Sequence, residues 1–230
     1  KKELKGLWDE VRKIQPIITE KLAIDGPFSA DIGEEIFVSQ DEDEIVLCLN
    51  YDGKFGLNNM NLYFQNANTK SQVYTWAEWT FKVGDPVIFL DTKRSYLLYN
   101  NLKGRIVDIS KRDSAILFTL DIDTILTERQ CRNESFEFVD VTDLGTRIRL
   151  EVIANDDESA AEEERTKTII PFQIAYAVSI HKAQGLEYNS VKIIIPSYNA
   201  EKISHSIFYT AITRAKEKLK IFWSAETMKA

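Results

Sequence analysis

Residues 176–214, near the end of the chain, read YAVSIHKAQGLEYNSVKIIIPSYNAEKISHSIFYTAITR. The stretch contains two polar clusters, and each is entered from an apolar run. Between them, Val191–Ile195 is almost wholly apolar, which is typical of a strand covered on both faces in a parallel sheet. Ile207–Ala215 predicts a helix, and Leu219–Trp223 predicts a final strand. The last turn of the helix is expected to be enriched in lysines, namely Lys216, Lys218 and Lys220.

A similar order of an apolar run followed by polar residues occurs earlier in the chain. Glu44–Asn50 is a short apolar run, followed by a polar loop with two glycines and a short helix that is expected to end near Asn66. A strand, a glycine loop and a helix form half of an α/β unit. From Ile170 to Ile180 apolar residues alternate, which predicts a strand that runs into the first polar cluster, although Ala175 and Ala177 also suit a helix.

The middle of the chain has a different pattern. Short apolar segments recur between turn signals, which is typical of a small β-barrel or sandwich. The predicted strands are Pro86–Leu90, Arg105–Ile109, Ala115–Leu120 and Phe136–Val139. The sequence therefore predicts an α/β domain with a parallel sheet that is interrupted by a β domain.

The resulting domain plan has five parts. We expect an amphipathic N-terminal helix over residues 4–14, ended by Pro16. The parts are an N-terminal helix and connector at 1–43, the first α/β part at 44–81, the inserted β domain at 82–150, an acidic loop at 151–168 and the second α/β part at 169–230.

The net charge of −7 argues at first against nucleic-acid binding. The charge is unevenly distributed, however, because residues 165–230 hold 10 Lys/Arg against 4 Asp/Glu, which leaves −13 on the first 164. The acidic run 156–164 supplies six of those negative charges. Such an asymmetry is compatible with a basic binding face behind an acidic total, and equally with solvated surface. The acidic run itself is expected to be an exposed linker, with a partner-binding role as the alternative.

Several classes of protein are disfavoured. No apolar run approaches the roughly 20 residues that span a bilayer, and the N-terminus lacks the apolar core of a signal peptide. It also lacks an initiator Met, so we expect a piece of a longer protein. Cys48 and Cys131 are the two cysteines, which favours the reducing cytoplasm over a disulfide framework. With two His and two Cys scattered along the chain, no metal site is expected. The chain has neither a Gly-x-x-x-x-Gly-Lys-Ser/Thr phosphate loop nor a Gly-x-Ser-x-Gly elbow.

The two polar clusters contain the candidate binding groups. Ser179, His181, Lys182 and Gln184 gather phosphate-binding groups at a strand end, where open α/β sheets bind ligands. Arg214 follows an apolar helix, and its planar fork suits a phosphate. Taken singly, the first cluster is also typical of an ordinary polar loop, and Arg214 of a surface arginine paired with a neighbouring acid, Glu217.

Taken together, the clusters are more specific. Tyr176–Tyr188 resembles motif V of superfamily 1 helicases, in the His-Lys-x-Gln-Gly form of the RecD-like branch, and Tyr209–Lys216 resembles motif VI. Gly56 with Asn61, Leu62 and Gln65 resembles the segment near motif IV, with Met60 and Phe64 in place of leucines and Asp52 where a basic residue is common. The segment from Val83 to Val87, with the turn at 100–104, resembles the opening of the SH3-like barrel inserted in this family. The resemblance covers residues 44–225.

The resemblance implies the second of two RecA-like domains, with ATP and Mg²⁺ bound in a cleft that needs the first, phosphate-loop domain. Arg214 is then the arginine finger, which stabilises the charge of the transferring phosphoryl group. Gln184, Gly185, Glu187 and Thr213 lie near the nucleotide, with Glu187 on the ribose.

The resemblance also implies that Ser179, His181 and Lys182 contact the backbone of single-stranded DNA, or RNA. The implied protein is an ATP-dependent helicase, of which this chain alone is inactive. The alternatives are a non-motor interaction module on a helicase-like scaffold, and a translocase that does not unwind duplex. The RecD-like form hints at 5′ to 3′ movement by analogy.

Overall fold

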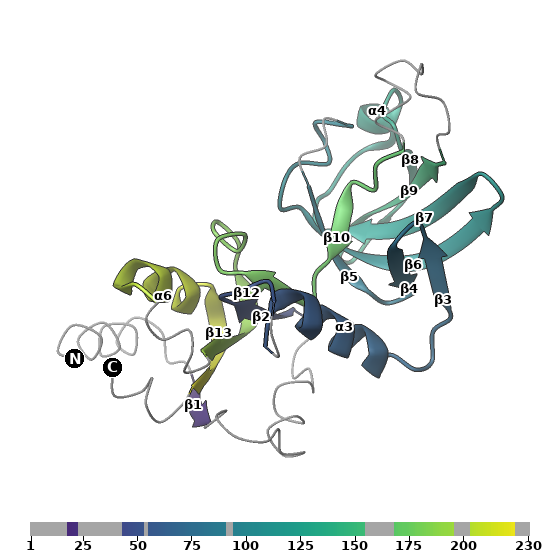
Figure 1. The fold of residues 1–230 in the computed structure, drawn as a ribbon. Helices are drawn as coiled ribbons and strands as arrows, with labels where there is room; N and C mark the ends of the chain where they lie inside the picture. Colours follow the sequence, from purple (N-terminus) through teal and green to yellow (C-terminus); the bar gives the residue numbers. More distant parts are fainter. Residues whose placement is uncertain are drawn as a thin grey trace. The chain divides into compact units, whose positions relative to one another are not determined.

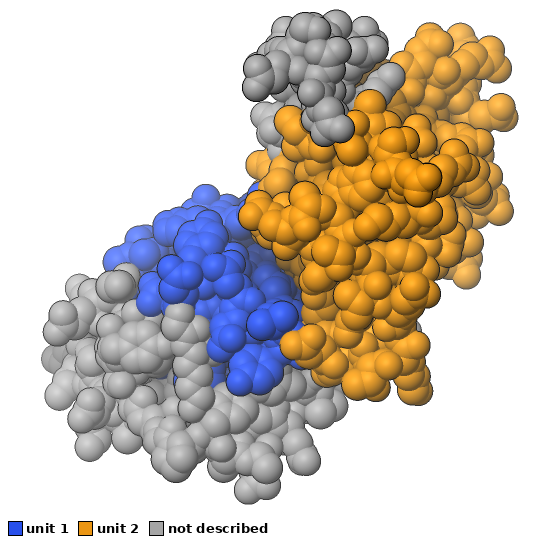
Figure 2. All heavy atoms as spheres, turned by 45° about the vertical axis from the view of Figure 1, so that its right-hand side comes forward, with its two compact units in different colours: residues 1–64, 176–230 blue, residues 65–175 orange. Residues whose placement is uncertain are grey.

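The computed structural model describes residues 18–22, 43–52, 55–90, 94–154, 168–195 and 203–223. The chain forms two compact units: unit 1 comprises residues 1–64 and 176–230, and unit 2 comprises residues 65–175 (Figure 1 and Figure 2). Unit 2 is wider on both sides than the expected insert at 82–150. The expected helix at 4–14 and the acidic run at 156–164 lie outside the described residues.

Unit 1 is built on a five-stranded sheet in which every neighbouring pair of strands is parallel. The strands in spatial order are β1 (Ile18–Leu22), β13 (Ala215–Trp223), β12 (Tyr188–Ile195), β2 (Glu44–Cys48) and β11 (Ala177–Ser179). The two apolar runs that predicted buried strands, in β2 and β12, lie inside the sheet between other strands. The predicted α/β class with a parallel sheet is confirmed.

Helix α3 (Leu57–Ala67) covers part of this sheet. Its residues Leu57, Met60 and Phe64 recur at the spacing of one helix face and are buried in a cluster with strand residues that include Val46 and Ile194. Helix α6 (His205–Ile212) begins at an N-cap serine and contacts β12 and β13, with Phe208, Ala211 and Ile212 buried. The helix expected to end near Asn66 therefore exists, and ends one residue later.

The boundary after α6 differs from the sequence-based prediction. The helix ends at Ile212, and β13 already begins at Ala215, so Lys216, Lys218 and Lys220 lie on a strand and not in the last helical turn. The reason is strand pairing, because Ala215 pairs with Tyr188 and the ladder then continues to the end of both strands. Tertiary pairing overrides the helical preference of the Ala-Lys-Glu-Lys segment here.

The single strand predicted from Ile170 to Ile180 is also wrong. The structure divides it into β10 (Phe172–Ile174) in unit 2 and β11 in unit 1. The adjacent residues Ala175 and Tyr176 bond to different units: the Ala175 N–H donates to Pro86 in unit 2, and the Tyr176 carbonyl accepts from Val46 in unit 1. The alternation persisted across the break because both short strands bury apolar side chains.

Unit 2 is dominated by a six-stranded antiparallel sheet in the order β10-β5-β6-β7-β9-β8. The further strands are β5 (Pro86–Phe89), β6 (Lys103–Arg112), β7 (Ala115–Ile122), β8 (Glu137–Thr142) and β9 (Gly145–Ile153). A separate hairpin joins β3 (Val73–Trp76) to β4 (Trp79–Lys82), and α4 (Glu128–Cys131) is a single capped turn. The core includes edge-to-face contacts among Phe81, Phe89, Phe118 and Phe172. The interruption of the α/β domain by a β domain is confirmed, and this antiparallel sheet is compatible with the SH3-like insert.

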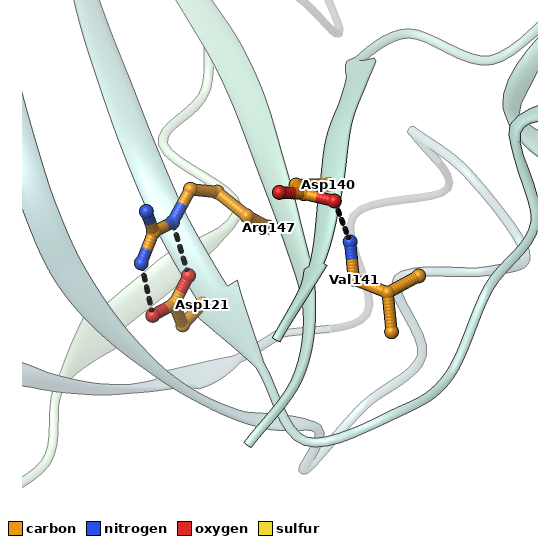
Figure 3. A network of polar contacts seen from close by, with 4 residues as sticks. All are labelled: Asp121, Asp140, Val141 and Arg147. Atoms are coloured by element: carbon orange, nitrogen blue, oxygen red, sulfur yellow. Dashed lines mark hydrogen bonds and ion pairs between the residues drawn. The ribbon is translucent and has the colours of Figure 1, made fainter. Parts of the chain in front are cut away.

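A polar network joins three strands of unit 2 (Figure 3). Arg147 on β9 makes two parallel bonds to Asp121 on β7, from Nε to Oδ1 at 2.7 Å and from NH2 to Oδ2 at 2.9 Å. Asp140 on β8 lies on the other side of Arg147, and both carboxylates raise the pKa of its guanidinium, chiefly through the hydrogen bond with Asp121. The Arg147–Asp121 pair therefore links β9 to β7, and the Asp140 charge adds an attraction from β8.

Candidate functional site

The candidate residues lie at opposite ends of the strands of the parallel sheet in unit 1. The end where the strands finish is called the carboxyl edge, and the end where they start is called the amino edge. Ser179 ends β11, so the segment that carries His181 and Lys182 begins at the carboxyl edge. Glu187 directly precedes β12, and Arg214 directly precedes β13, so both lie at the amino edge. The loop 180–187 runs from one edge to the other.

Strand register gives the distance between these edges. Ser179 pairs with Cys48, which in turn pairs with Ile194, whereas Tyr188 pairs with Ala215. Six residue steps along β12 separate Tyr188 from Ile194, which is roughly 20 Å at about 3.3 Å per residue. One short segment of sequence therefore reaches two separate surfaces.

At the carboxyl edge, the first turn after β11 is closed by Ser179. Its Oγ accepts the Lys182 N–H at 3.2 Å, and its carbonyl accepts the Ala183 N–H at 3.1 Å. Ser179 is itself buried, while His181 is exposed and Lys182 is half-buried. Partial burial lowers the pKa of the Lys182 ammonium, because desolvation disfavours the charged form. Of the three predicted nucleic-acid contacts, His181 and Lys182 therefore have side chains that solvent can reach, whereas Ser179 is buried.

Between the edges, the loop turns at Gly185, which has φ of +81°. A Cβ at this position would meet no atom within 4 Å, so the glycine is required for its left-handed backbone and not for space. Gln184 and Glu187 are exposed. The Glu187 carboxylate lies 4.0 Å from the Lys216 ammonium, at the limit of an ion pair, and both side chains are largely exposed.

Arg214 is held at the amino edge by three hydrogen bonds. Its Nε donates to the Thr210 carbonyl at 2.9 Å, its NH1 to the Leu186 carbonyl at 2.9 Å, and its NH2 to Thr213 Oγ1 at 3.1 Å. Within the described residues it makes no ion pair with Glu217. The contact with Leu186 is a direct link between the first polar cluster and the second.

Thr213 supports this arrangement. It is the C-cap of α6, and its hydroxyl lies 2.9 Å from the Tyr209 carbonyl and 3.1 Å from the Thr210 carbonyl. Because a hydroxyl has one proton and two acceptor lone pairs, it can donate to the helix and still accept from Arg214. Thr213 therefore orients the arginine.

Sequence reasoning missed two structural supports. The side-chain amide of Asn61 makes the pair of hydrogen bonds to β11 that a neighbouring strand would make. Its Nδ2 donates to the Ala177 carbonyl at 3.0 Å, and its Oδ1 accepts the Ala177 N–H at 2.9 Å. The buried Lys192 ammonium lies 2.7 Å from the Glu44 carboxylate, which also accepts from Ser190 Oγ at 2.6 Å. The lysine within an otherwise apolar strand was a signal for the second feature.

The amino edge of β2 has a further connection to β12. Asp43 accepts the Asn189 N–H through its carboxylate at 3.2 Å and the Ser190 N–H through its carbonyl at 3.2 Å. Beside it, burial and the Asp43 charge raise the pKa of the Tyr188 hydroxyl, so this tyrosine is neutral. The start of β12, next to Arg214, is therefore firmly fixed.

Two kinds of feature are absent from the described part of the chain. No group of three or more His, Cys, Asp or Glu side chains there is placed to hold a metal ion. None of the helices described is long and apolar enough to span a bilayer.

Comparison with known proteins supports the resemblance of the two polar clusters to helicase motifs. Residues 174–221 match the family model of the UvrD-like helicase C-terminal domain. The chain is 22% identical over 185 residues to the RecBCD enzyme subunit RecD of Buchnera aphidicola, covering 79% of this chain and 25% of the relative. It is 29% identical over 86 residues to the ATP-dependent RecD2 DNA helicase of Deinococcus radiodurans, covering 37% of this chain and 11% of that protein.

Among solved structures, the chain is similar to Bacteroides Pif1 bound to ssDNA, with a TM-score of 0.43, 15% identity, and coverage of 96% of this chain and 49% of Pif1. The chain spans about a quarter of the length of the RecD relatives that it matches over most of its own length. Its matched region contains both polar clusters and the strand between them. The family-model match confirms the resemblance to the C-terminal region of superfamily 1 helicases over residues 174–221.

Proposed function

We propose that the chain is the C-terminal part of an ATP-dependent DNA helicase or translocase, and that it acts together with a phosphate-loop domain that is not in this sequence. The observation that carries the proposal is the position of Arg214, which is fixed by α6 and by the Leu186 carbonyl at the amino edge of the sheet. A positioned arginine without a phosphate loop in its own chain suits a finger that reaches a nucleotide held mainly by another domain.

Arg214 has the donors for this role. A guanidinium has five N–H groups, and three are engaged here, so two remain for phosphate oxygens. Such a finger contributes on the order of 10³ to 10⁵ in rate in known NTPases. A bound nucleotide supplies the phosphoryl group that is transferred to water. In this chain, Gln184, Gly185 and Glu187 would lie beside it.

At the other edge, His181 and Lys182 would bind the backbone of single-stranded DNA, with Ser179 holding their turn. These groups contact phosphates and so carry little base specificity. Because the loop 180–187 joins this edge to the carbonyl that holds Arg214, a shift of the loop would change both surfaces. Coupling of nucleotide turnover to strand movement would use this loop. Both cysteines are free and buried, which agrees with a cytoplasmic protein.

The test uses a protein that contains this chain together with its phosphate-loop domain. Arg214→Ala should lower ATP turnover by about 10³-fold or more while nucleotide affinity, measured with a fluorescent analogue, changes little. The control is Arg129→Ala, at an exposed position on α4 of unit 2. The 230-residue chain alone should not hydrolyse ATP.

Near-normal turnover of the Arg214 variant would remove the finger assignment, and robust hydrolysis by the chain alone would remove the need for a second domain. Single-strand binding without any nucleotide turnover in the complete protein would favour the non-motor interaction module.

A further inference from the structure

A second feature of the carboxyl edge lies outside the two polar clusters. A hollow of about 400 Å³ opens between the loop that follows β2 and the first turns of α3. Its lining residues are Tyr51, Asp52, Asn58, Asn59 and Leu62.

The loop beside the hollow is held tightly against the helix. The Leu57 N–H donates to the Asn50 carbonyl at 2.9 Å, and the Asn58 N–H donates to the Tyr51 carbonyl at 3.1 Å. A Cβ on Gly56 would lie 2.5 Å from the Asp52 backbone, so only glycine permits this close return of the chain. The backbone of Tyr51 is therefore fixed before any ligand arrives.

Two of the lining side chains are apolar and open to solvent. Tyr51 is 61% exposed and Leu62 is 52% exposed, so an aromatic ring and an aliphatic side chain both border the recess. An aromatic ring open to solvent is what single-strand-binding proteins use to stack an unpaired base, at about 1–3 kcal/mol per base. The volume is at the lower end of small-ligand sites, of roughly 300–1,000 Å³.

The polar groups argue for a base and against a phosphate. Asp52 brings a negative charge to the hollow, which repels a phosphate group. Its Oδ1 accepts from Asn58 Nδ2 at 3.3 Å, which turns the amide nitrogen of Asn58 toward the carboxylate. The acceptor capacity that remains on Asp52 suits the exocyclic amine of adenine or cytosine, whereas thymine has no exocyclic amine.

The hollow lies at the same edge of the sheet as the proposed single-strand contacts. Cys48, the last residue of β2, pairs with Ser179, and Tyr51 follows three residues later. The hollow and the turn with His181 and Lys182 therefore follow adjacent strands at the same edge of the sheet. Cations for the phosphates and a ring for a base are both available there.

We propose that the hollow takes one unstacked nucleobase of the single strand, stacked on Tyr51, with Asp52 selecting adenine or cytosine over thymine. This inference rests on the proposed single-strand binding at the same edge. It adds a base-dependent contact to an edge whose other contacts are to phosphates.

The experiment measures the fluorescence anisotropy of labelled oligo-dA, oligo-dC and oligo-dT with the 230-residue chain. Tyr51→Ala should weaken oligo-dA and oligo-dC by about tenfold, equivalent to about 1.4 kcal/mol, and Tyr51→Phe should restore them. Asp52→Asn should reduce the preference over oligo-dT. The matched control is Tyr63→Ala, because Tyr63 is 49% exposed on α3 but does not line the hollow.

A second readout separates this inference from the proposed function. Deoxyadenosine and deoxycytidine, which have no phosphate, should shift the backbone amide NMR signals of Asn58, Asn59 and Leu62 and leave those of Lys182 unchanged. If Lys182→Ala weakens the oligonucleotides but Tyr51→Ala does not, the hollow is not a base site and the proposed function stands. If no oligonucleotide binds to the chain, the proposed single-strand binding at this edge fails, and the absence of nucleoside shifts would then overturn the hollow as well.

Discussion

The two edges of the parallel sheet in unit 1 are built differently. At the amino edge, Arg214 makes three hydrogen bonds, and Asp43 ties the start of β2 to β12. At the carboxyl edge, His181 and Tyr51 are exposed. Under the proposed function, the amino edge is set in advance for one precise contact, whereas the carboxyl edge presents side chains to an extended ligand.

The first prediction concerns the buried charges at the amino end of β2, and it has the largest expected effect. Lys192→Met leaves the Glu44 carboxylate buried without its cation, and removal of one partner of a buried pair costs about 3–5 kcal/mol. Urea denaturation should show this loss in the free energy of unfolding. The matched control is Arg149→Met in unit 2, whose pair with Glu137 is exposed and should cost under about 1 kcal/mol. Equal losses for the two variants would contradict a specially fixed amino edge.

The second prediction concerns the support of β11, the strand that ends at Ser179. Asn61→Ala removes both side-chain bonds to Ala177 and should cost about 1–3 kcal/mol, because a backbone N–H and a carbonyl lose their partners. Amide hydrogen exchange should quicken at Ala177. Asn66→Ala, at an exposed position of the same helix, is the control. Unchanged exchange in the Asn61 variant would show that β11 does not depend on α3.

The third prediction concerns Lys182 at the carboxyl edge. Lys182→Ala should weaken single-strand binding several-fold and to a similar degree for all base compositions, since a phosphate contact carries no sequence information. The slope of log affinity against log salt should fall by about one unit or slightly less. Affinity titrations at several salt concentrations measure both effects. An unchanged slope would place Lys182 away from the phosphates.

The fourth prediction concerns the buried thiol at the end of β2, and its effect is the smallest. Burial raises the pKa of the Cys48 thiol to about 12, whereas the unfolded chain ionises its thiol at lower pH. The neutral thiol therefore contributes stability that is full below the unfolded pKa and is lost as pH rises toward 12. At pH 9.5 the loss should be below about 1 kcal/mol relative to pH 7. Comparison with Cys48→Ala isolates it, and an identical pH dependence of the two proteins would contradict a buried thiol.

Parts of the fold were predictable because a strand that is buried on both faces has a nearly continuous run of apolar residues. The apolar runs in β2 and β12 are short and rich in β-branched residues, which favours strands covered on both faces. The same reasoning missed β9, although Thr146, Ile148, Leu150 and Val152 alternate and are all buried. Charged residues interleave with them on the exposed face, and the predicted domain limit at residue 150 cut the strand.

Other parts depend on contacts that local sequence does not reveal. The strand at Lys216 exists because β12 and β1 lie on either side of it, and the two short strands around Tyr176 exist because each pairs with a different sheet. For the site, the candidate residues come from the two polar clusters, and their roles stay predictions. The resemblance implied that Ser179 and Arg214 serve different ligands, but only strand register gave the distance between them.

The most direct test of the central proposal, that the two edges serve two ligands, compares Arg214→Ala with Lys182→Ala in the complete protein. ATP turnover at saturating single strand and single-strand affinity are measured for both variants. The account predicts that the arginine variant loses turnover by about 10³-fold and keeps its single-strand affinity, whereas the lysine variant loses affinity and keeps most of its turnover. If the two variants lose both properties in parallel, or the arginine variant keeps its turnover, the separation of the edges is contradicted.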